Sequence, residues 1–237
     1  MAPRSRPPLE YRSQCVTRSE ITALLAGVEG WLSAREAAAL FACARRCRGR
    51  GVIVEIGSWK GRSTIVLAAG ARAGAGGPVY AVDPHQGLRH HGGEPTFAAF
   101  QANVAAAGLA DLVRPLEQLS ADAARTFTSP VELIYIDGAH DHAAVLEDFT
   151  AWFPKVLDGG VMAFHDTVGY PGPRRVVRDH LYRSRRFRHI RFAGTLTYAE
   201  RVAANTARER AGNRVRWWIN QLYAGLFFVV RRPGPLA

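Results

Sequence analysis

The segment that most constrains the fold of this chain is residues 131–167, VELIYIDGAHDHAAVLEDFTAWFPKVLDGGVMAFHDT. Residues 131–136 and 160–164 are apolar runs of the kind that form buried strands. Residues 141–153, between them, carry apolar side chains at helical spacing. A strand, a helix and a strand predict a parallel unit whose two strand carboxyl ends lie at one edge of a sheet. Because ligands bind at that edge in open sheets, the segment predicts an α/β protein with its site there.

Five polar side chains follow the two strands and should therefore lie close together. They are Asp137, His140, Asp141, His165 and Asp166. Such a group can hold a metal ion or move a proton. Three of them also have a purely structural interpretation. Asp137 could accept hydrogen bonds from turn amides, Asp141 could cap the helix that it begins, and His165 could be a packed, hydrogen-bonded side chain.

The rest of the chain has patterns that continue the alternation of strands and helices. Further strands are predicted at 51–56, 78–82 and 111–116, with a final strand pair at 189–199. Ser33 and Glu36 form a capping box that predicts the start of a helix. Other helices are predicted at 65–73, 96–107 and 174–183.

The two ends of the chain differ in composition from its centre. Residues 1–30 are predicted to be an N-terminal arm, 31–200 the main domain and 201–237 a C-terminal extension. The extension is rich in aromatic and apolar residues, so it is expected to be a packed helix, a lid or a dimer contact. Four aromatic side chains are expected to be buried in the domain or in a dimer: Trp217, Trp218, Phe227 and Phe228.

The formal net charge is +11, and the only lysines are Lys60 and Lys155. An anionic partner such as nucleic acid is one explanation, and a general preference for arginine codons in an Ala- and Gly-rich chain is the other. We favour the second and expect no nucleic acid partner. The three cysteines form no CxxC pair, which favours a reducing, cytoplasmic location. No signal peptide and no membrane-spanning segment are expected.

The turn after residues 51–56 has the features of a cofactor loop. Gly57 allows a tight turn and Gly61 lets the next helix begin close to the strand. The dinucleotide pattern G-x-G-x-x-G is absent, because Glu55 stands at its first position. A carboxylate there disfavours a pyrophosphate and suits an ammonium group. Asp83, at the end of the second strand, could accept both hydroxyls of a ribose, so S-adenosylmethionine (SAM) is favoured over NAD.

The sequence resembles the class I SAM-dependent methyltransferases over roughly residues 28–200. Three stretches carry the resemblance: VEIGSWKGRST, VYAVDP and the segment 131–167. The last is most similar to the small-molecule and sugar O-methyltransferases of the macrocin type, and it also resembles the methylmannose polysaccharide O-methyltransferases. The resemblance implies a Rossmann-like, seven-stranded, mostly parallel sheet flanked by helices.

The resemblance also implies roles for individual residues. Asp137 and Asp166 match metal-ligand positions, Asp137 also borders the cofactor, and His140 matches the general base. His165 stands where the metal-dependent members often have Glu, which makes it a candidate third ligand. The positions implied to contact the cofactor are Glu55, Gly57, Ser58, Gly61, Ser63, Asp83, Gln118 and Ser120, the last two at the adenine.

The chemistry that follows is methyl transfer from SAM to a hydroxyl of a sugar, an oligosaccharide or polysaccharide precursor, or a glycosylated metabolite. A divalent ion would lower the pKa of that hydroxyl, and His140 would take its proton. Two carboxylates suit Mg²⁺, whereas His165 as a ligand would favour Mn²⁺. Tyr170 could line the acceptor pocket. The alternatives are a catechol-type or other phenolic O-methyltransferase and a basic nucleic-acid-binding protein. A homodimer is expected.

Overall fold

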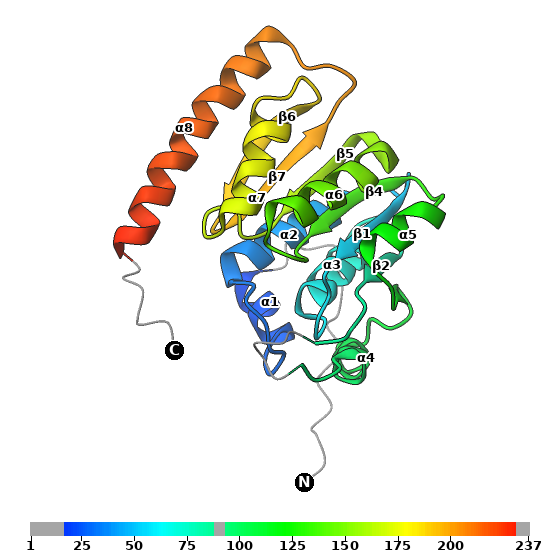
Figure 1. The fold of residues 1–237 in the computed structure, drawn as a ribbon. Helices are drawn as coiled ribbons and strands as arrows, with labels where there is room; N and C mark the ends of the chain where they lie inside the picture. The colour runs from blue at the N-terminus through cyan, green and yellow to red at the C-terminus, as the bar shows by residue number, and fades with distance from the viewer. Residues whose placement is uncertain (1–16, 88–92, 231–237) are drawn as a thin grey trace.

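The computed structural model describes residues 17–87 and 93–230, and its centre is a seven-stranded sheet in the order β3-β2-β1-β4-β5-β7-β6 (Figure 1). The first five strands are parallel, and β7 is antiparallel to both β5 and β6. The strands are β1 (Val52–Ile56), β2 (Val79–Val82), β3 (Val113–Leu116), β4 (Val131–Ile136), β5 (Val156–Phe164), β6 (Phe187–Ala193) and β7 (Leu196–Arg201). The predicted fold class is confirmed.

Helices cover both faces of this sheet (Figure 1). The helices are α1 (Arg18–Leu24), α2 (Ala34–Arg45), α3 (Arg62–Ala73), α4 (Phe97–Ala106), α5 (Ser120–Thr126), α6 (His142–Trp152), α7 (Pro171–Val176) and α8 (Ala207–Val230). A 3₁₀ turn, Phe153–Lys155, follows α6, and a π-helical segment, Val177–Tyr182, follows α7. The helix predicted at 174–183 is thus the end of α7 and this π segment.

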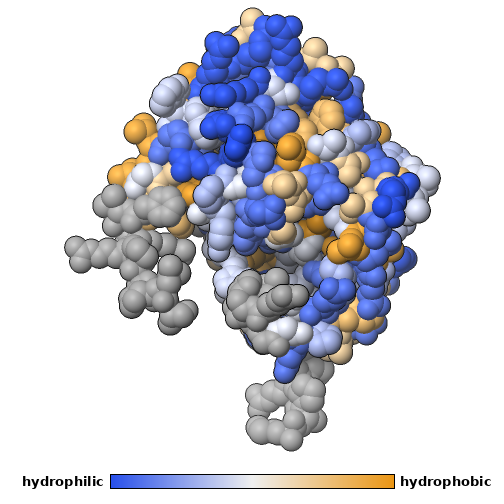
Figure 2. All heavy atoms as spheres, viewed as in Figure 1, coloured by the Kyte–Doolittle hydropathy of each residue, from blue (hydrophilic) through white to orange (hydrophobic). Residues whose placement is uncertain are grey.

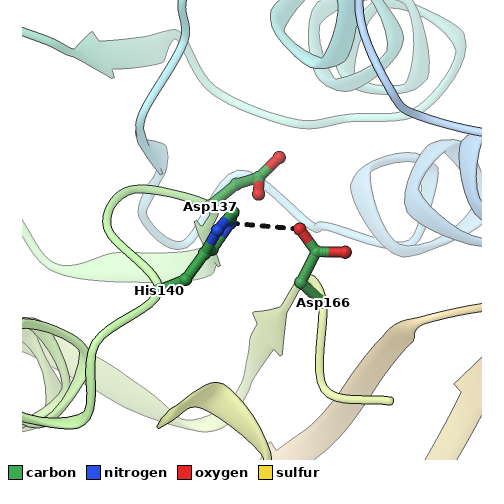
Figure 3. A group of neighbouring side chains, drawn as sticks. All are labelled: Asp137, His140 and Asp166. Atoms are coloured by element: carbon green, nitrogen blue, oxygen red, sulfur yellow. Dashed lines mark ion pairs between the residues drawn. The ribbon is translucent and has the colours of Figure 1, made fainter. Parts of the chain in front are cut away.

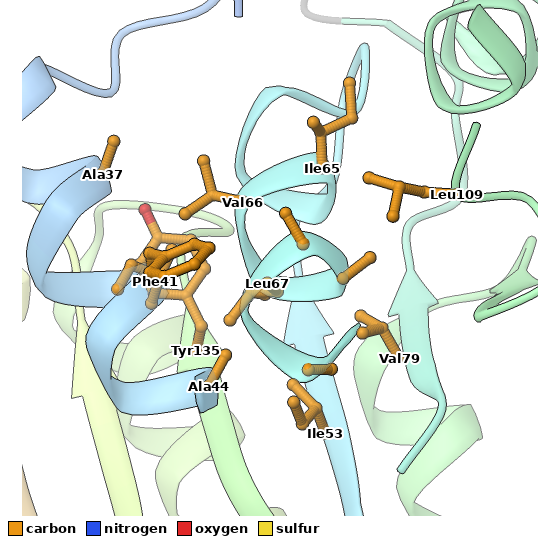
Figure 4. Close-up of a cluster of buried hydrophobic side chains, with 14 of the residues drawn as sticks. Ala37, Phe41, Ala44, Ile53, Ile65, Val66, Leu67, Val79, Leu109 and Tyr135 are labelled. Carbon is orange, nitrogen blue, oxygen red and sulfur yellow. The ribbon is translucent and has the colours of Figure 1, made fainter. Parts of the chain in front are cut away.

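The alternation of side chains along the central strands divides the core in two. Leu133 and Tyr135 of β4 pack with α1 to α4 on one face. Ile134 and Ile136 pack with α5 to α7 on the other. Figure 4 shows the first cluster, where α2 and α3 lie over Tyr135 and its neighbours. Since β4 is buried on both faces, the continuous apolar run that predicted it is explained.

The N-terminal arm was expected to extend to residue 30. The structured domain begins earlier, with α1 at Arg18. Thr17 and Glu20 form a capping box at the start of α1. Four apolar residues from this region are buried in the first cluster: Ile21, Leu24, Leu25 and Val28. Most of the residues expected in the arm, 1–16, lie outside the described part of the chain.

Within the expected C-terminal extension, Ala207–Val230 form a single long helix, α8, beside the edge strand β6 (Figure 1). The Nδ2 groups of Asn205 and Asn213 both donate to the carbonyl oxygen of Phe187, at 2.6 Å and 3.0 Å, and the ring of Trp217 packs on Tyr182. Trp218, however, is 68% exposed, so the domain does not bury it and its burial in a dimer stays a prediction; the side chain of Phe228 lies outside the described residues. None of the helices in the described ranges combines the length and the apolar character that a membrane span requires.

Candidate functional site

The loop between β1 and α3 is held close to the end of β4. Gly57 has φ +83°, and a Cβ there would lie 2.3 Å from the carbonyl oxygen of Asp137. Gly61 has φ +87° and forms the N-cap of α3. Only glycine fits the first of these positions, because a side chain would collide with the backbone of the neighbouring strand end.

Asp83, at the end of β2, fixes the same loop. Its Oδ2 accepts hydrogen bonds from the backbone amides of Ser58 and Trp59, at 2.9 Å and 2.8 Å. Its Oδ1 accepts one from the amide of His85 at 2.7 Å. The residue predicted to bind a ribose therefore also joins β2 to the β1–α3 loop, a contact that sequence reasoning did not foresee.

Glu55 lies beneath the loop and is completely buried. Burial raises the pKa of its carboxyl to about 8, although Ser63 and Thr64 donate hydrogen bonds that lower it. The hydroxyl of Thr64 donates to Oε2, and Oε1 has no hydrogen-bond partner within the described residues. A carboxyl with this pKa is largely protonated at neutral pH, which differs from the charged carboxylate expected from the sequence.

The predicted adenine residues lie between β3 and α5. Gln118 is half-buried, and Ser120 begins α5. The Ser120 hydroxyl accepts a hydrogen bond from Trp152 Nε1 at 2.9 Å, so it also links α5 to α6. Its predicted contact with a cofactor stays a prediction.

Three of the five predicted strand-end side chains form one open cluster, shown in Figure 3: Asp137, His140 and Asp166. Each offers a ligand atom, and these atoms all lie within 4.8 Å of one another. His140 Nε2 is 3.1 Å from Asp166 Oδ2, which raises the pKa of the imidazole. All three side chains are partly exposed. The convergence inferred from the parallel strand–helix–strand unit is thus present.

His165 lies behind this cluster and is buried. Its Nδ1 is 3.2 Å from Asp137 Oδ1 and 3.4 Å from Asp166 Oδ2. Its Nε2 is 3.6 Å from Glu36 Oε2. Burial disfavours the charged imidazole, but the surrounding carboxylates outweigh it and raise the pKa to about 12. Since a doubly protonated ring has no free lone pair, this arrangement favours the packed, hydrogen-bonded interpretation of His165 over that of a metal ligand.

Glu36 is a member of the site that the sequence did not reveal. It does form the predicted capping box, with its Oε2 accepting from the amide of Ser33 at 2.8 Å. It also receives the amide and the hydroxyl of Thr195, at 2.6 Å and 2.8 Å, and faces His165. Burial alone would raise the pKa of Glu36, but these partners lower it to about 2. The only sequence pattern that includes Glu36 is the capping box. A capping box predicts contacts between residues close in the chain, so it does not predict the contacts of Glu36 with Thr195 and His165.

Two aromatic residues border the open cluster. The Tyr135 hydroxyl donates to Asp137 Oδ2 at 2.8 Å and so orients that carboxylate. The ring of Tyr170 is 46% exposed and stacks on His140 with centroids 4.1 Å apart. Asp141 caps α6 by accepting from the amide of Ala144 at 3.0 Å, as its structural interpretation predicted.

The central part of the chain is similar to known proteins. Residues 54–167 match the family model described as a methyltransferase domain. A curated relative, the uncharacterized protein y4gI of Sinorhizobium fredii, is 33% identical over 127 residues, which are 48% of this chain and 13% of that protein. The chain therefore spans only a small part of the curated relative that it matches.

Several solved methyltransferase structures share the fold. The O-methyltransferase NovP superposes with a TM-score of 0.62 at 18% identity, over 73% of this chain and 83% of its own. TomG of Streptomyces achromogenes, solved with SAM, gives 0.56 at 21% identity over 78% and 89%. An O-methyltransferase of Bacillus cereus, solved with S-adenosylhomocysteine (SAH), gives 0.54 at 19% identity over 78% and 90%. The predicted resemblance to class I methyltransferases is confirmed, and its narrower sugar-specific part stays a prediction.

Proposed function

Because residues 54–167 match a methyltransferase domain model and the chain shares the fold of solved O-methyltransferases, we propose that this chain transfers the methyl group of SAM to a hydroxyl of a sugar or glycosylated metabolite. The observation that carries the proposal is the cluster of two carboxylates and one imidazole beside the Gly57 loop. A methyl donor at the loop and a hydroxyl at the cluster would lie side by side. Positioning of this kind supplies a large part of the catalysis of a displacement reaction.

SAM is the proposed cofactor. Two of the structurally similar O-methyltransferases hold SAM or SAH, and this chain has the same fold. The Asp83 carboxylate, held beside the tight loop at Gly57 by the amides of Ser58 and Trp59, would accept the ribose hydroxyls of such a ligand. The dinucleotide pattern G-x-G-x-x-G is absent from this loop, where Glu55 stands at its first position, which supports SAM over NAD.

A divalent ion, Mg²⁺ or Mn²⁺, fits the donor set. Asp137 and Asp166 would hold it, with His140 next to them. Three carboxylates, those of Glu36, Asp137 and Asp166, surround the single imidazolium of His165, so the site keeps an excess of negative charge. When bound, such an ion would lower the pKa of the acceptor hydroxyl and orient it.

His140 is the proposed general base. Its Nε2 faces the open cluster, and the Asp166 carboxylate beside it stabilises the protonated ring. When bound, SAM would supply the methyl group to the acceptor oxygen as its C–S bond breaks and SAH forms, and His140 Nε2 would take the hydroxyl proton. Tyr170 keeps the imidazole in place by stacking and offers its exposed ring to the apolar face of a sugar.

The test is SAM consumption over a panel of sugars and phenols, with and without EDTA. Asp137→Asn and Asp166→Asn should abolish EDTA-sensitive turnover and leave SAM binding in place. His140→Ala should lower kcat by about 10²–10⁴-fold, the usual contribution of a positioned base. Asp141→Asn is the matched control, because asparagine also caps helices and Asp141 is outside the cluster.

Three outcomes would contradict parts of the proposal. Full turnover in EDTA would exclude the metal. Activity on phenols that survives loss of His140 would point to the phenolic alternative, because a phenol is already acidic. Tight binding of NAD without binding of SAM would overturn the cofactor assignment. The predicted homodimer and cytoplasmic location are separate proposals, and the unpaired buried thiols of Cys43 and Cys47 support the second.

A further inference from the structure

The face of α8 that points away from the domain is unusually apolar. Five of its side chains are 50–71% exposed, and we call them the outer face: Val215, Trp218, Ile219, Leu222 and Leu226. Their spacings of three, four, seven and eleven residues from Val215 place them on one side of a helix. In Figure 2 the orange atoms at the left edge of the molecule lie over the lower half of α8.

The fold does not need the outer face. The opposite side of α8 carries the buried residues Asn213, Asn220 and Ala224. Arg174 donates a hydrogen bond to Gln221 and so joins α8 to α7. Since this inner side holds the helix on the domain, selection for folding does not account for a row of large exposed apolar side chains.

Positive charge borders the outer face. Arg214 and Arg216 are exposed and lie on either side of Val215, and Arg208 lies almost two turns before Val215 on the same side of the helix. The only acidic residue of α8 is Glu209, whose Oε1 is 3.7 Å from Arg188 Nη1. No carboxylate of the helix is therefore left to balance the three arginines at the outer face.

We propose that the outer face of α8 binds the surface of an anionic lipid membrane. A helix with a row of Trp, Leu and Ile bordered by arginines has the properties of an interfacial helix, with apolar side chains in the acyl boundary and arginines at the headgroups. A second copy of the chain would bring the same arginines together in a protein whose net charge is already +11, so charge complementarity favours the lipid.

The geometry also fixes which end of the domain meets the membrane. Near the apolar end of α8, the ring of Tyr223 lies 5.3 Å from that of Phe192 and 5.9 Å from the Cζ atom of Arg35. Arg35 precedes Glu36, the partner of His165. The end of the sheet that carries the catalytic cluster would thus lie beside the lipid surface, and an amphiphilic acceptor could reach it from there.

The experiment is sedimentation of the full chain with vesicles of phosphatidylcholine alone and with 30% phosphatidylglycerol. The chain should bind the anionic vesicles and release them in high salt. Arg214→Gln with Arg216→Gln should weaken binding about 30-fold, because each arginine near the surface contributes about 1 kcal/mol. Leu222→Glu with Leu226→Glu should abolish it.

Two control variants distinguish binding through the outer face from a general effect of net charge or of exposed apolar side chains. Arg114→Gln with Arg125→Gln removes the same net charge from exposed positions at the far side of the sheet, and Leu119→Glu changes another exposed leucine. Both controls should bind as the wild type does, and thermal unfolding should show all variants folded. Failure of the wild type to bind anionic vesicles, equal loss in the controls, or a dimer in light scattering that Leu222→Glu with Leu226→Glu converts to monomers would each overturn the proposal.

Discussion

His165 shows how a single buried residue decides the character of the site. Three carboxylates surround its ring and raise its pKa, and the ring therefore holds Glu36, Asp137 and Asp166 in a fixed relation. A buried charge of this kind is tolerated only with its partners present. His165 is thus best understood as the group that positions the two carboxylates of the open cluster.

Replacing Glu36 with glutamine tests this interpretation. The change leaves the imidazolium with one partner fewer, so the free energy of unfolding should fall by about 3 kcal/mol, in the range for removing one member of a buried ion pair. Because the pKa of Glu36 is lowered from 4.5 to about 2, its contribution is complete above pH 4.5 and is lost as the pH falls toward 2. Denaturant unfolding at pH 7 and at low pH measures both effects.

Glu20→Gln is the matched control for Glu36. Both glutamates occupy the same position of a capping box, but Glu20 is exposed and lies at the start of α1. The control should lose much less stability than Glu36→Gln. Equal losses in the two variants would mean that Glu36 acts only as a cap.

The titration of His140 gives a second prediction at this scale. In the chain freed of metal, the Asp166 carboxylate raises the pKa of His140 above 6.5, and Asp166→Asn should bring it down. A raised histidine pKa stabilises the folded state at low pH, and this contribution is lost as the pH rises through the raised value. NMR of the imidazole Cε1–H signal measures the pKa. A value at or below 6.5 in the wild type would contradict the ion pair.

At the scale of elements, the close approach of two loops brings the proposed cofactor site next to the open cluster. The β1–α3 turn at Gly57 touches the backbone of Asp137 at the end of β4, and Asp83 fixes the turn from β2. Three parallel strands thus bring their carboxyl ends into one site, as the topology of an open α/β sheet requires.

Gly57→Ala should disrupt this contact. The added Cβ would lie 2.3 Å from a backbone oxygen that cannot move freely, and φ is +83°. We expect loss of SAM binding and more than about 3 kcal/mol of stability, as for other backbone clashes. Gly108→Ala is the control, because Gly108 has φ +68° with no atom near its Cβ, and it should cost only about 1–2 kcal/mol. Calorimetry with SAM and chemical unfolding distinguish the two.

For the whole molecule, ligand binding should couple to stability. SAM at a concentration 100 times its Kd should add about 2.7 kcal/mol to the free energy of unfolding, and NAD should add nothing. Asp83→Asn should reduce the effect of SAM, whereas Asp158→Asn, at an exposed position of β5, should not. Thermal melts with each ligand measure the shift. An equal rise in Tm with NAD would contradict the cofactor assignment.

Much of the architecture was predictable because it depends on residues that are close in sequence. The apolar run 131–136, the helical spacing after Asp141 and the capping box at Ser33 each describe a local element, and each element is present. The parallel strand–helix–strand unit then imposes the meeting of Asp137 and Asp166, because its two strands must end at the same edge. The sequence by itself therefore determined the fold class and the open cluster.

Only the tertiary structure decided the charge states and the long-range partners. Glu36 reaches His165 because α2 packs on one face of the sheet and begins near the end of β5, and no local pattern encodes that contact. The raised pKa of Glu55 follows from complete burial, which is a property of the packed core. The exposure of Trp218 follows from which side of α8 meets β6. Pairing and burial depend on distances between elements far apart in the chain, and packing alone sets those distances.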